Sequence, residues 1–312
     1  LLGVFKYYDF FAVELSNLLG IGTALPLLEL TLPVGISFFT FQAMSYVIDL
    51  RRGVIQPMKP LDFAVYLSFF PQLVAGPIVR ASEMAPQIAN RPDPRQVPSA
   101  EAFHLILRGL FKKVVVSSWL ASNLVEDVFA DPEAHSGLDA LFAVYGYAIQ
   151  IYADFSGYTD IAIGVALLLG FRFPLNFDQP YRALSLRDFW RRWHITLSSW
   201  LRDYLYIPLG GNRGQTADLY RNLLITMLLG GLWHGSTWNF VIWGAIHGVA
   251  LVIERSLPIH RIHPLGRWVI TFHVVCFAWV FFRADSFSGA WEVLSAIATP
   301  SGDTKQLNVG LI

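Results

Sequence analysis

Long apolar segments follow one another along this chain, and only short polar breaks separate them. Just 15% of the residues are charged, against the roughly 25% that is usual in soluble domains. A run of about 20 apolar residues can cross a bilayer as a helix. We therefore predict an all-α, polytopic integral membrane protein with about seven to nine membrane segments. Apolar segments cover residues 32–50, 61–78, 102–125, 138–169, 219–232, 238–253 and 268–282, of which the last two are the strongest candidates.

The composition excludes one class of partner and two kinds of cysteine site. The net charge is zero, so no overall field attracts nucleic acid, and we expect no nucleic-acid partner. The single cysteine, Cys276, rules out an internal disulfide and a cysteine metal cluster. Trp, Tyr and Phe make up 15% of the residues, which suits a protein that contacts lipid at two membrane–water interfaces.

The domain organisation is expected to be simple. We find no repeat, no low-complexity tract and no sizeable soluble domain, so residues 1–312 are interpreted as one membrane domain. Since the chain starts without Met, we expect an internal piece of a longer protein, with helices missing on both sides. Breaks at 80–95, 182–192 and 255–267 are rich in Arg and are predicted to be cytoplasmic. The break at 126–139 has no Lys or Arg and is predicted to lie outside.

The most informative single residue is His247, inside the apolar stretch 238–253. A titratable side chain within a membrane segment is costly to bury and marks a functional site by default. Gly244 and Gly248 flank it and allow another backbone to approach closely. The alternative is a packed histidine that only bonds neighbouring helices. Two more histidines, His194 and His234, lie upstream in aromatic surroundings.

Residues 185–206 are predicted to form one basic, aromatic helix at the membrane interface. Ser185 and Asp188 resemble a capping box at its start. A polar stripe then follows the helical spacing through Arg187, Arg191, His194, Ser198 and Arg202. Two interpretations are compatible: the arginines anchor the helix to anionic lipid, or they draw an anionic ligand towards His194.

Two further groups of polar residues invite a chemical interpretation. Asp154 and Asp160 lie within the apolar segment 138–169, where buried carboxylates must be paired, hydrogen-bonded or protonated. A structural network is favoured over a proton relay because hydroxyl side chains lie close by. His260 and His263 stand in a basic break with no third ligand nearby, so no metal site is predicted.

Taken together, several motifs resemble the membrane-bound O-acyltransferase (MBOAT) family. They are Phe189-Trp-Arg-Arg-Trp-His194-Ile-Thr-Leu-Ser198, Trp233-His-Gly-Ser-Thr-Trp-Asn-Phe240 and Trp243-Gly-Ala-Ile-His247-Gly. Tyr152-Ala-Asp-Phe-Ser-Gly-Tyr-Thr-Asp160 and Phe70-Pro-Gln-Leu-Val-Ala-Gly-Pro-Ile78 are similar to the bacterial branch of that family. This branch includes the membrane subunit of alginate O-acetylation and the D-alanyl transfer protein of teichoic acid modification. The resemblance runs from Leu32 to about Phe287.

The resemblance implies a helical membrane body with a thinned centre, where a funnel reaches the active site. It also implies an O-acyltransferase, specifically an O-acetyltransferase of exported polysaccharide such as alginate, in the bacterial inner membrane. His247 matches the family's near-universal catalytic histidine, and His194 matches a position that is His in this branch and often Asn elsewhere. Neutral imidazole suits a base that activates a hydroxyl, and burial in a low dielectric favours the neutral form. A second histidine could hold the donor carbonyl or stabilise the oxyanion.

The substrates and partners implied by the resemblance are an acyl thioester, expected to be acetyl-CoA, and a polysaccharide acceptor. No bound cofactor is expected. Relatives often work with an extracytoplasmic SGNH-type acetyltransferase, so such a partner is expected here. Arg187 and Arg191 are the candidate donor-binding residues, because Arg matches phosphate groups well.

Two other classes of protein would share some of these features. A membrane transporter or channel also contains broken helices and intramembrane carboxylates. A scaffold that only recruits an extracytoplasmic transferase would also need a membrane domain. Chemistry separates them, since neither alternative needs a base or turns over a thioester.

Overall fold

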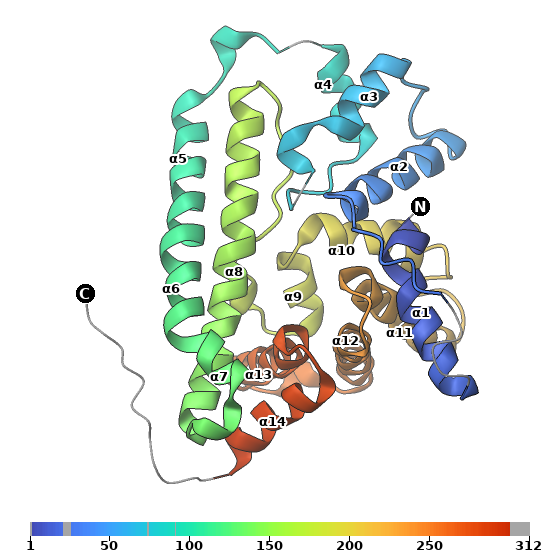
Figure 1. The fold of residues 1–312 in the computed structure, drawn as a ribbon. Coiled ribbons are helices and arrows are strands. Elements are labelled where there is room, and N and C mark those ends of the chain that lie inside the picture. Colours follow the sequence, from blue (N-terminus) through green and yellow to red (C-terminus); the bar gives the residue numbers. More distant parts are fainter. Residues whose placement is uncertain (1, 21–25, 74, 91, 300–312) are drawn as a thin grey trace.

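The computed structural model describes residues 2–20, 26–73, 75–90 and 92–299. Within these ranges every regular element is a helix, which confirms the predicted all-α class (Figure 1). The α-helices of more than one turn are α1 (Leu2–Leu19), α2 (Ile36–Arg51), α3 (Pro60–Ser68), α4 (Ala81–Ala89), α5 (Ser99–Leu110), α7 (Glu126–Ala130), α8 (Gly137–Leu168), α9 (Leu186–Arg192), α10 (Ile195–Leu201), α11 (Thr216–His234), α12 (Trp238–Ser256), α13 (Pro264–Arg283) and α14 (Phe287–Ala298).

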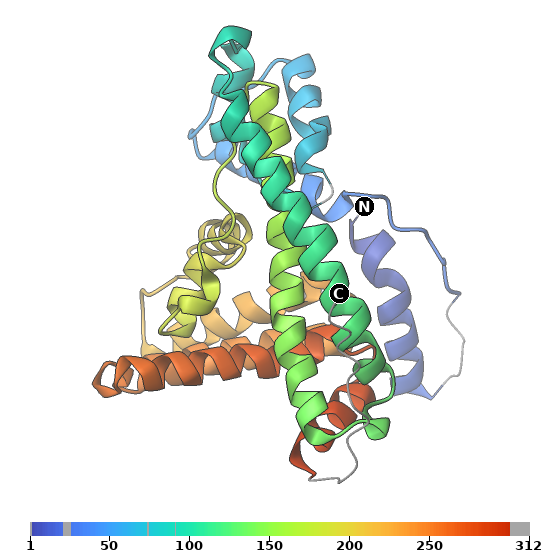
Figure 2. The same ribbon diagram turned by 90° about the vertical axis from the view of Figure 1, so that its left-hand side faces the viewer.

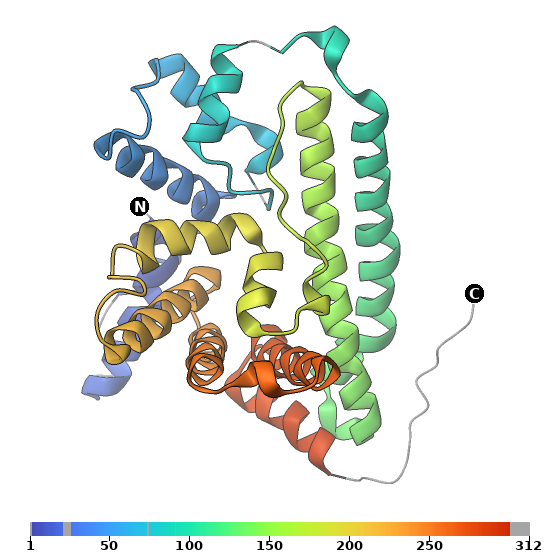
Figure 3. The same cartoon turned by 180° about the vertical axis from the view of Figure 1, so that it is seen from behind.

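A long two-helix layer forms one side of the molecule (Figures 1 and 3). Helix α5 continues through π-helical turns and the short α6 (Ser118–Leu120) into α7, and this rod packs along α8. A side chain at Gly157 of α8 would lie 2.8 Å from the carbonyl oxygen of Gly109, so glycine is required for this approach. The outer face of the rod stays apolar and exposed, at Phe103, Leu107 and Val114. Such a face is suited to contact with lipid or another apolar surface.

Helices α11 and α12 form a tight hairpin that carries two of the three candidate histidines. The predicted close approach at the flanking glycines is confirmed. A side chain on Gly244 would collide with the carbonyl of Met227 on α11, and one on Gly248 would lie 3.1 Å from Leu224 Cδ2. The hairpin therefore holds His247 firmly against its neighbours.

The prediction of one helix over residues 185–206 is wrong. Helix α9 starts as expected, because the Ser185 side chain accepts a hydrogen bond from the Asp188 backbone at 3.0 Å. It ends at Arg192, however, and α10 begins only after His194. The polar stripe is broken there: Arg187 and Arg191 lie on the exposed surface, whereas His194 is buried.

The Arg-rich break at 80–95 contains a helix in its first part. Helix α4 is closed at its start by Glu83, whose side chain accepts from the backbone N–H of Arg80 at 3.0 Å. Ala81 and Met84 are fully buried. Packing of these two side chains therefore outweighs the helix-breaking effect of the prolines.

Within the described ranges, two helices, α8 and α13, are long and apolar enough to cross a membrane. Figure 2 shows α13 crossing the lower half of α8 steeply, and the two helices are in contact. The other segments that were predicted to cross the membrane form helices that are shorter or more polar than α8 and α13.

Candidate active site

His194 lies in the break between α9 and α10. Its backbone φ of 43° is left-handed, which costs a non-glycine residue about 1–3 kcal/mol unless its surroundings impose it. In this structure the segment 176–178, which precedes α9, imposes the left-handed conformation on His194. The backbone of Asp178 donates to the carbonyl of Arg192, and that of Ile195 donates to the carbonyl of Asn176, both at 2.9 Å. These bonds turn His194 into the interior, where its exposed fraction is 1%.

The Asn176 side chain determines which nitrogen of His194 carries the proton. Its Oδ1 accepts from the Thr196 backbone N–H at 3.2 Å and from the Thr196 hydroxyl at 2.9 Å. The same oxygen lies 3.1 Å from His194 Nδ1, which must therefore be the donor. In the neutral ring, Nε2 is then a free acceptor, and it has no partner in the described part of the chain.

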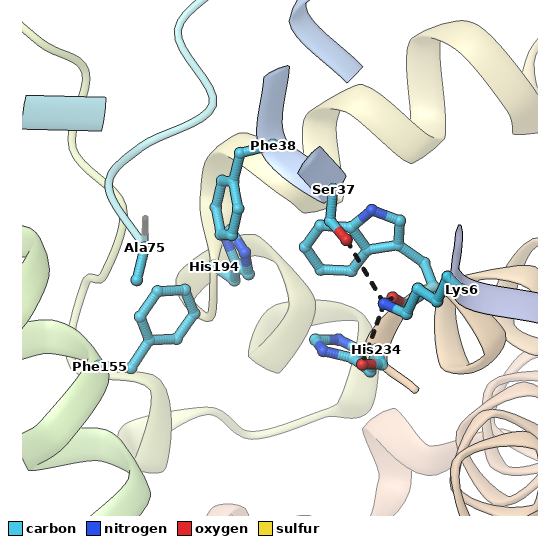
Figure 4. Close-up of a pocket in the computed structure, with 8 residues that line it drawn as sticks. Lys6, Ser37, Phe38, Ala75, Phe155, His194 and His234 are labelled. Carbon is cyan, nitrogen blue, oxygen red and sulfur yellow. Dashed lines mark hydrogen bonds between the residues drawn. The ribbon is translucent and has the colours of Figure 1, made fainter. Parts of the chain in front are cut away.

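His194 and His234 meet at one cavity of about 200 Å³ (Figure 4). Phe38, Phe155 and Ala75 form the apolar part of its wall, and Lys6 closes another side. The full lining is Lys6, Ser37, Phe38, Ala75, Phe155, His194, Trp233 and His234. The cavity thus joins two imidazoles from separate helices in mostly apolar surroundings, which is the setting in which buried acid–base groups act.

Helix α1 fixes the end of α11 that carries His234. The last carbonyl groups of a helix have no partner within it. Tyr7 donates to the carbonyl of Leu232 at 2.9 Å, and the Lys6 ammonium donates to the carbonyls of Trp233 and His234. Lys6 also reaches the Ser37 hydroxyl at 3.4 Å, so all three of its donors are used. Lys6 therefore acts here as a positioning residue for His234.

Replacing Lys6 with methionine in the full-length protein is expected to lower both thermal stability and kcat. A cation at a helix C-terminus contributes about 0.3–1 kcal/mol, and up to about 2 kcal/mol when it is partly buried. Lys6→Arg, which keeps the charge and the donors, should restore most of the lost kcat. Thermal unfolding in detergent and steady-state kinetics measure both effects. Wild-type stability and kcat in Lys6→Met would contradict the positioning role.

His247 lies outside the lining of this cavity. Its exposed fraction is 0%, and its ring is enclosed by Phe189, Trp190 and Trp243 at centroid distances of 6.1, 5.0 and 4.9 Å. Neither ring nitrogen has a hydrogen-bond partner within the described residues. Buried polar atoms without partners are rare, so the interpretation of His247 as a purely structural hydrogen-bonding residue finds no support in these contacts.

Aromatic rings connect the three histidines. Trp233 lies 6.3 Å from the ring of His194 and 5.0 Å from that of His234. Trp243 lies 5.1 Å from His234 and 4.9 Å from His247. The structure thus brings His194 and His234 together at the cavity, whereas His247 packs against Trp243 and does not line the cavity.

The other predicted site residues lie elsewhere. Arg187 and Arg191 are exposed on α9 and line no part of the cavity. Asp160 accepts hydrogen bonds from Arg108 and Lys112 of the rod, and Asp154 pairs with Lys113. The two carboxylates therefore belong to an ion-pair network, as favoured above, although their partners are cations of the neighbouring helix instead of hydroxyls.

Two residues with a proposed role at the cavity, His234 and Lys6, had no role assigned from the sequence. For His234 the available signal was the Trp-His-Gly sequence at a helix end, which a packed aromatic turn would share. Lys6 lies more than two hundred positions away in the chain, and only the packing of α1 on α11 brings them together.

Comparison with known proteins gives one family. The sequence model described as "MBOAT, membrane-bound O-acyltransferase family" matches residues 18–284. The chain is 46% identical over 303 residues to a protein named "Probable alginate O-acetylase AlgI" from Pseudomonas aeruginosa, covering 95% of this chain and 58% of that protein.

Two relatives with lower sequence identity are also named as transferases. A protein named peptidoglycan O-acetyltransferase from Helicobacter pylori is 41% identical over 337 residues, covering 97% of this chain and 63% of that protein. A teichoic acid D-alanyltransferase from Streptococcus thermophilus is 31% identical over 237 residues, covering 72% and 57%. The chain thus spans less than two thirds of the length of these relatives.

Proposed function

This chain belongs to the membrane-bound O-acyltransferase family, and from that premise we propose that it is the catalytic part of a bacterial O-acetyltransferase that modifies an exported polysaccharide. The observation that carries the proposal is the cavity shared by His194 and His234. The donor is a cytoplasmic acetyl thioester such as acetyl-CoA. The acceptor is an extracytoplasmic hydroxyl, reached directly or through an SGNH-type partner enzyme.

The two histidines have different roles in this proposal, because they sit at opposite kinds of helix end. His194 is the N-cap of α10, where the helix dipole disfavours a positive charge. It stays neutral and offers Nε2 as an acceptor that orients an N–H or O–H of a substrate. His234 ends α11, where carbonyl groups favour a positive charge but the neighbouring Lys6 ammonium opposes one, so its resting ring is neutral and can accept a proton. We assign His234 the role of general base.

The reaction follows from these roles. His234 removes the proton of the acceptor hydroxyl as its oxygen attacks the thioester carbonyl. A C–O bond forms, the C–S bond breaks, and the proton passes from His234 to the departing thiolate. The products are an acetyl ester and a free thiol. The sequence-based candidate for the base, His247, packs against the same Trp243 ring as His234 but does not line the cavity.

We further propose that the full-length protein is multi-pass and resides in the inner membrane, with the Arg-rich segments on the cytoplasmic side. The many exposed apolar side chains on its helices, such as Phe111 and Val114 of the rod, support a lipid environment. Acetyl transfer would then cross the membrane.

A sided transfer assay tests this function. Inverted membrane vesicles that contain the full-length protein and a trapped soluble acceptor should transfer label from radiolabelled acetyl-CoA added outside. Right-side-out vesicles should not, because the donor then faces the wrong side. Equal labelling in both orientations would contradict transfer across the membrane, and labelling in neither would contradict the acyltransferase function.

A further inference from the structure

A second, polar pocket of about 220 Å³ lies between the rod, α8 and residues 175–179. Its lining consists of Arg108, Lys112, Tyr152, Ser156, Thr159, Asp160, Ile163, Leu175, Asn176, Phe177, Asp178 and Gln179. None of these residues lines the cavity with the two histidines. The pocket and the cavity are therefore separate hollows with different chemistry.

Only one layer of side chains separates them. Asn176 lines the polar pocket, and its Oδ1 holds His194, which lines the cavity. Two consecutive residues of α8 divide in the same way, since Phe155 lines the cavity and Ser156 lines the pocket. A ligand in the pocket would thus end beside the wall that carries His194.

The pocket lining carries two cations, Arg108 and Lys112, and two carboxylates, Asp160 and Asp178, and both cations bind Asp160. Asp160 accepts from Arg108 Nε at 2.9 Å and Nη2 at 2.7 Å, and from Lys112 Nζ at 2.8 Å. Two cations thus share one carboxylate. Ser156 adds a free hydroxyl: its exposed fraction is 1%, and its Oγ has no partner in the described part of the chain. A buried hydroxyl without a partner, in a pocket wall, calls for a ligand.

The pocket also lies towards the predicted cytoplasmic side. Helix α8 begins beside the break at 126–139, which lacks Lys and Arg. After α8 ends, the Arg172 backbone exchanges hydrogen bonds with Gln87 of the Arg-rich stretch 80–95. Ser156, Thr159, Asp160 and Ile163 belong to the second half of α8, so this part of the pocket is nearer to the Arg-rich end.

We propose, building on the function above, that this pocket binds the phosphate-bearing arm of the thioester donor, with Lys112 and Arg108 as the phosphate-binding cations. Guanidinium and ammonium groups form strong, charge-assisted hydrogen bonds to phosphate. The thioester end then lies beside the wall formed by Asn176, whose Oδ1 holds His194. This assigns donor recognition to the rod and α8, in place of Arg187 and Arg191 on the exposed face of α9.

Lys112→Gln in the full-length protein provides the test. Arg108 keeps both of its bonds to Asp160, so the fold should survive the change. We expect the apparent KM for acetyl-CoA to rise roughly tenfold, as for the loss of one charge-assisted hydrogen bond. The KM for S-acetylpantetheine, which has no phosphate, should stay the same. Equal rises for both donors, or no rise for acetyl-CoA, would overturn the proposal.

Two control variants sharpen the comparison. Lys113→Gln removes the same charge one position along, from a lysine that pairs with Asp154 and does not line the pocket. The double change of Arg187 and Arg191 to Gln removes the cations of α9. Neither control should alter the KM for acetyl-CoA, and a rise only in the double variant would favour guidance by α9 and overturn the proposal.

Direct binding separates this proposal from the function on which it rests. Calorimetric titration with free coenzyme A needs no turnover, and Lys112→Gln should weaken this binding even in a preparation that transfers no acetyl group. Nanodiscs of phosphatidylcholine alone, or with phosphatidylglycerol, distinguish a lipid phosphate from the donor phosphate. If Lys112→Gln weakens the binding of coenzyme A only in the nanodiscs that contain phosphatidylglycerol, the pocket binds a lipid headgroup and the proposal fails.

Discussion

His194→Ala in the full-length protein is expected to lower acetyl transfer roughly 100-fold, with the protein still folded in the membrane. Nε2 of His194 faces the cavity as a free acceptor, and Nδ1 is fixed on Asn176. Loss of an orienting group next to the reacting atoms costs about two orders of magnitude in rate even where it moves no proton. Initial rates with saturating acetyl-CoA measure the effect, and thermal unfolding controls for stability.

His194→Asn separates orientation from proton transfer. The Asn side-chain oxygen can also accept a hydrogen bond, so this variant should keep a clearly measurable part of the wild-type rate. An amide cannot take up a proton at neutral pH. If His194→Asn is as inactive as His194→Ala while both remain folded, then His194 itself moves the proton and the roles proposed for the two histidines must be exchanged.

The helical class could be predicted from the sequence because apolar segments of suitable length leave few other folds. The α11–α12 hairpin was also predictable in part. Gly244 and Gly248 indicate a close approach whatever the partner helix is, and Met227 turned out to be the neighbour. Both features depend on local composition, which a single sequence displays directly.

The break at His194 could not be predicted in this way. The spacing of Arg187, Arg191 and His194 fits a continuous helix, and no glycine or proline interrupts it. What ends the helix is a set of hydrogen bonds from the segment around Asn176, which lies 18 positions before His194. Tertiary contacts of this kind override local helix propensity, and periodicity does not reveal them.

Prediction of the site from the sequence was limited in the same way, by tertiary contacts that the local sequence does not reveal. The sequence indicated that histidines in aromatic, apolar surroundings would be important, and His194 does lie at the cavity. The sequence offered His247 as the base, and the proposal of His234 in its place rests on which ring lines the cavity. The two residues belong to adjacent helices of one hairpin, and both rings pack against the indole of Trp243.

A matched pair of variants, His234→Gln and His247→Gln, tests the central claim that proton transfer takes place at the cavity. Glutamine is similar in size to histidine and cannot act as a base. Loss of a general base lowers the rate by about 10²–10⁴-fold. Because His234 lines the cavity and His247 does not, we expect a loss in this range for His234→Gln only. His247→Gln should stay within about tenfold of wild type, the effect expected from disturbed packing without loss of chemistry.

The most direct measurement is the single-turnover rate of acetyl transfer from acetyl-CoA by the two purified full-length variants, each shown by thermal unfolding to be folded. We expect His234→Gln to be at least roughly 100-fold slower than wild type and His247→Gln to retain most of the rate. An inactive His247→Gln beside an active His234→Gln would rule out His234 as the base and place the base at His247.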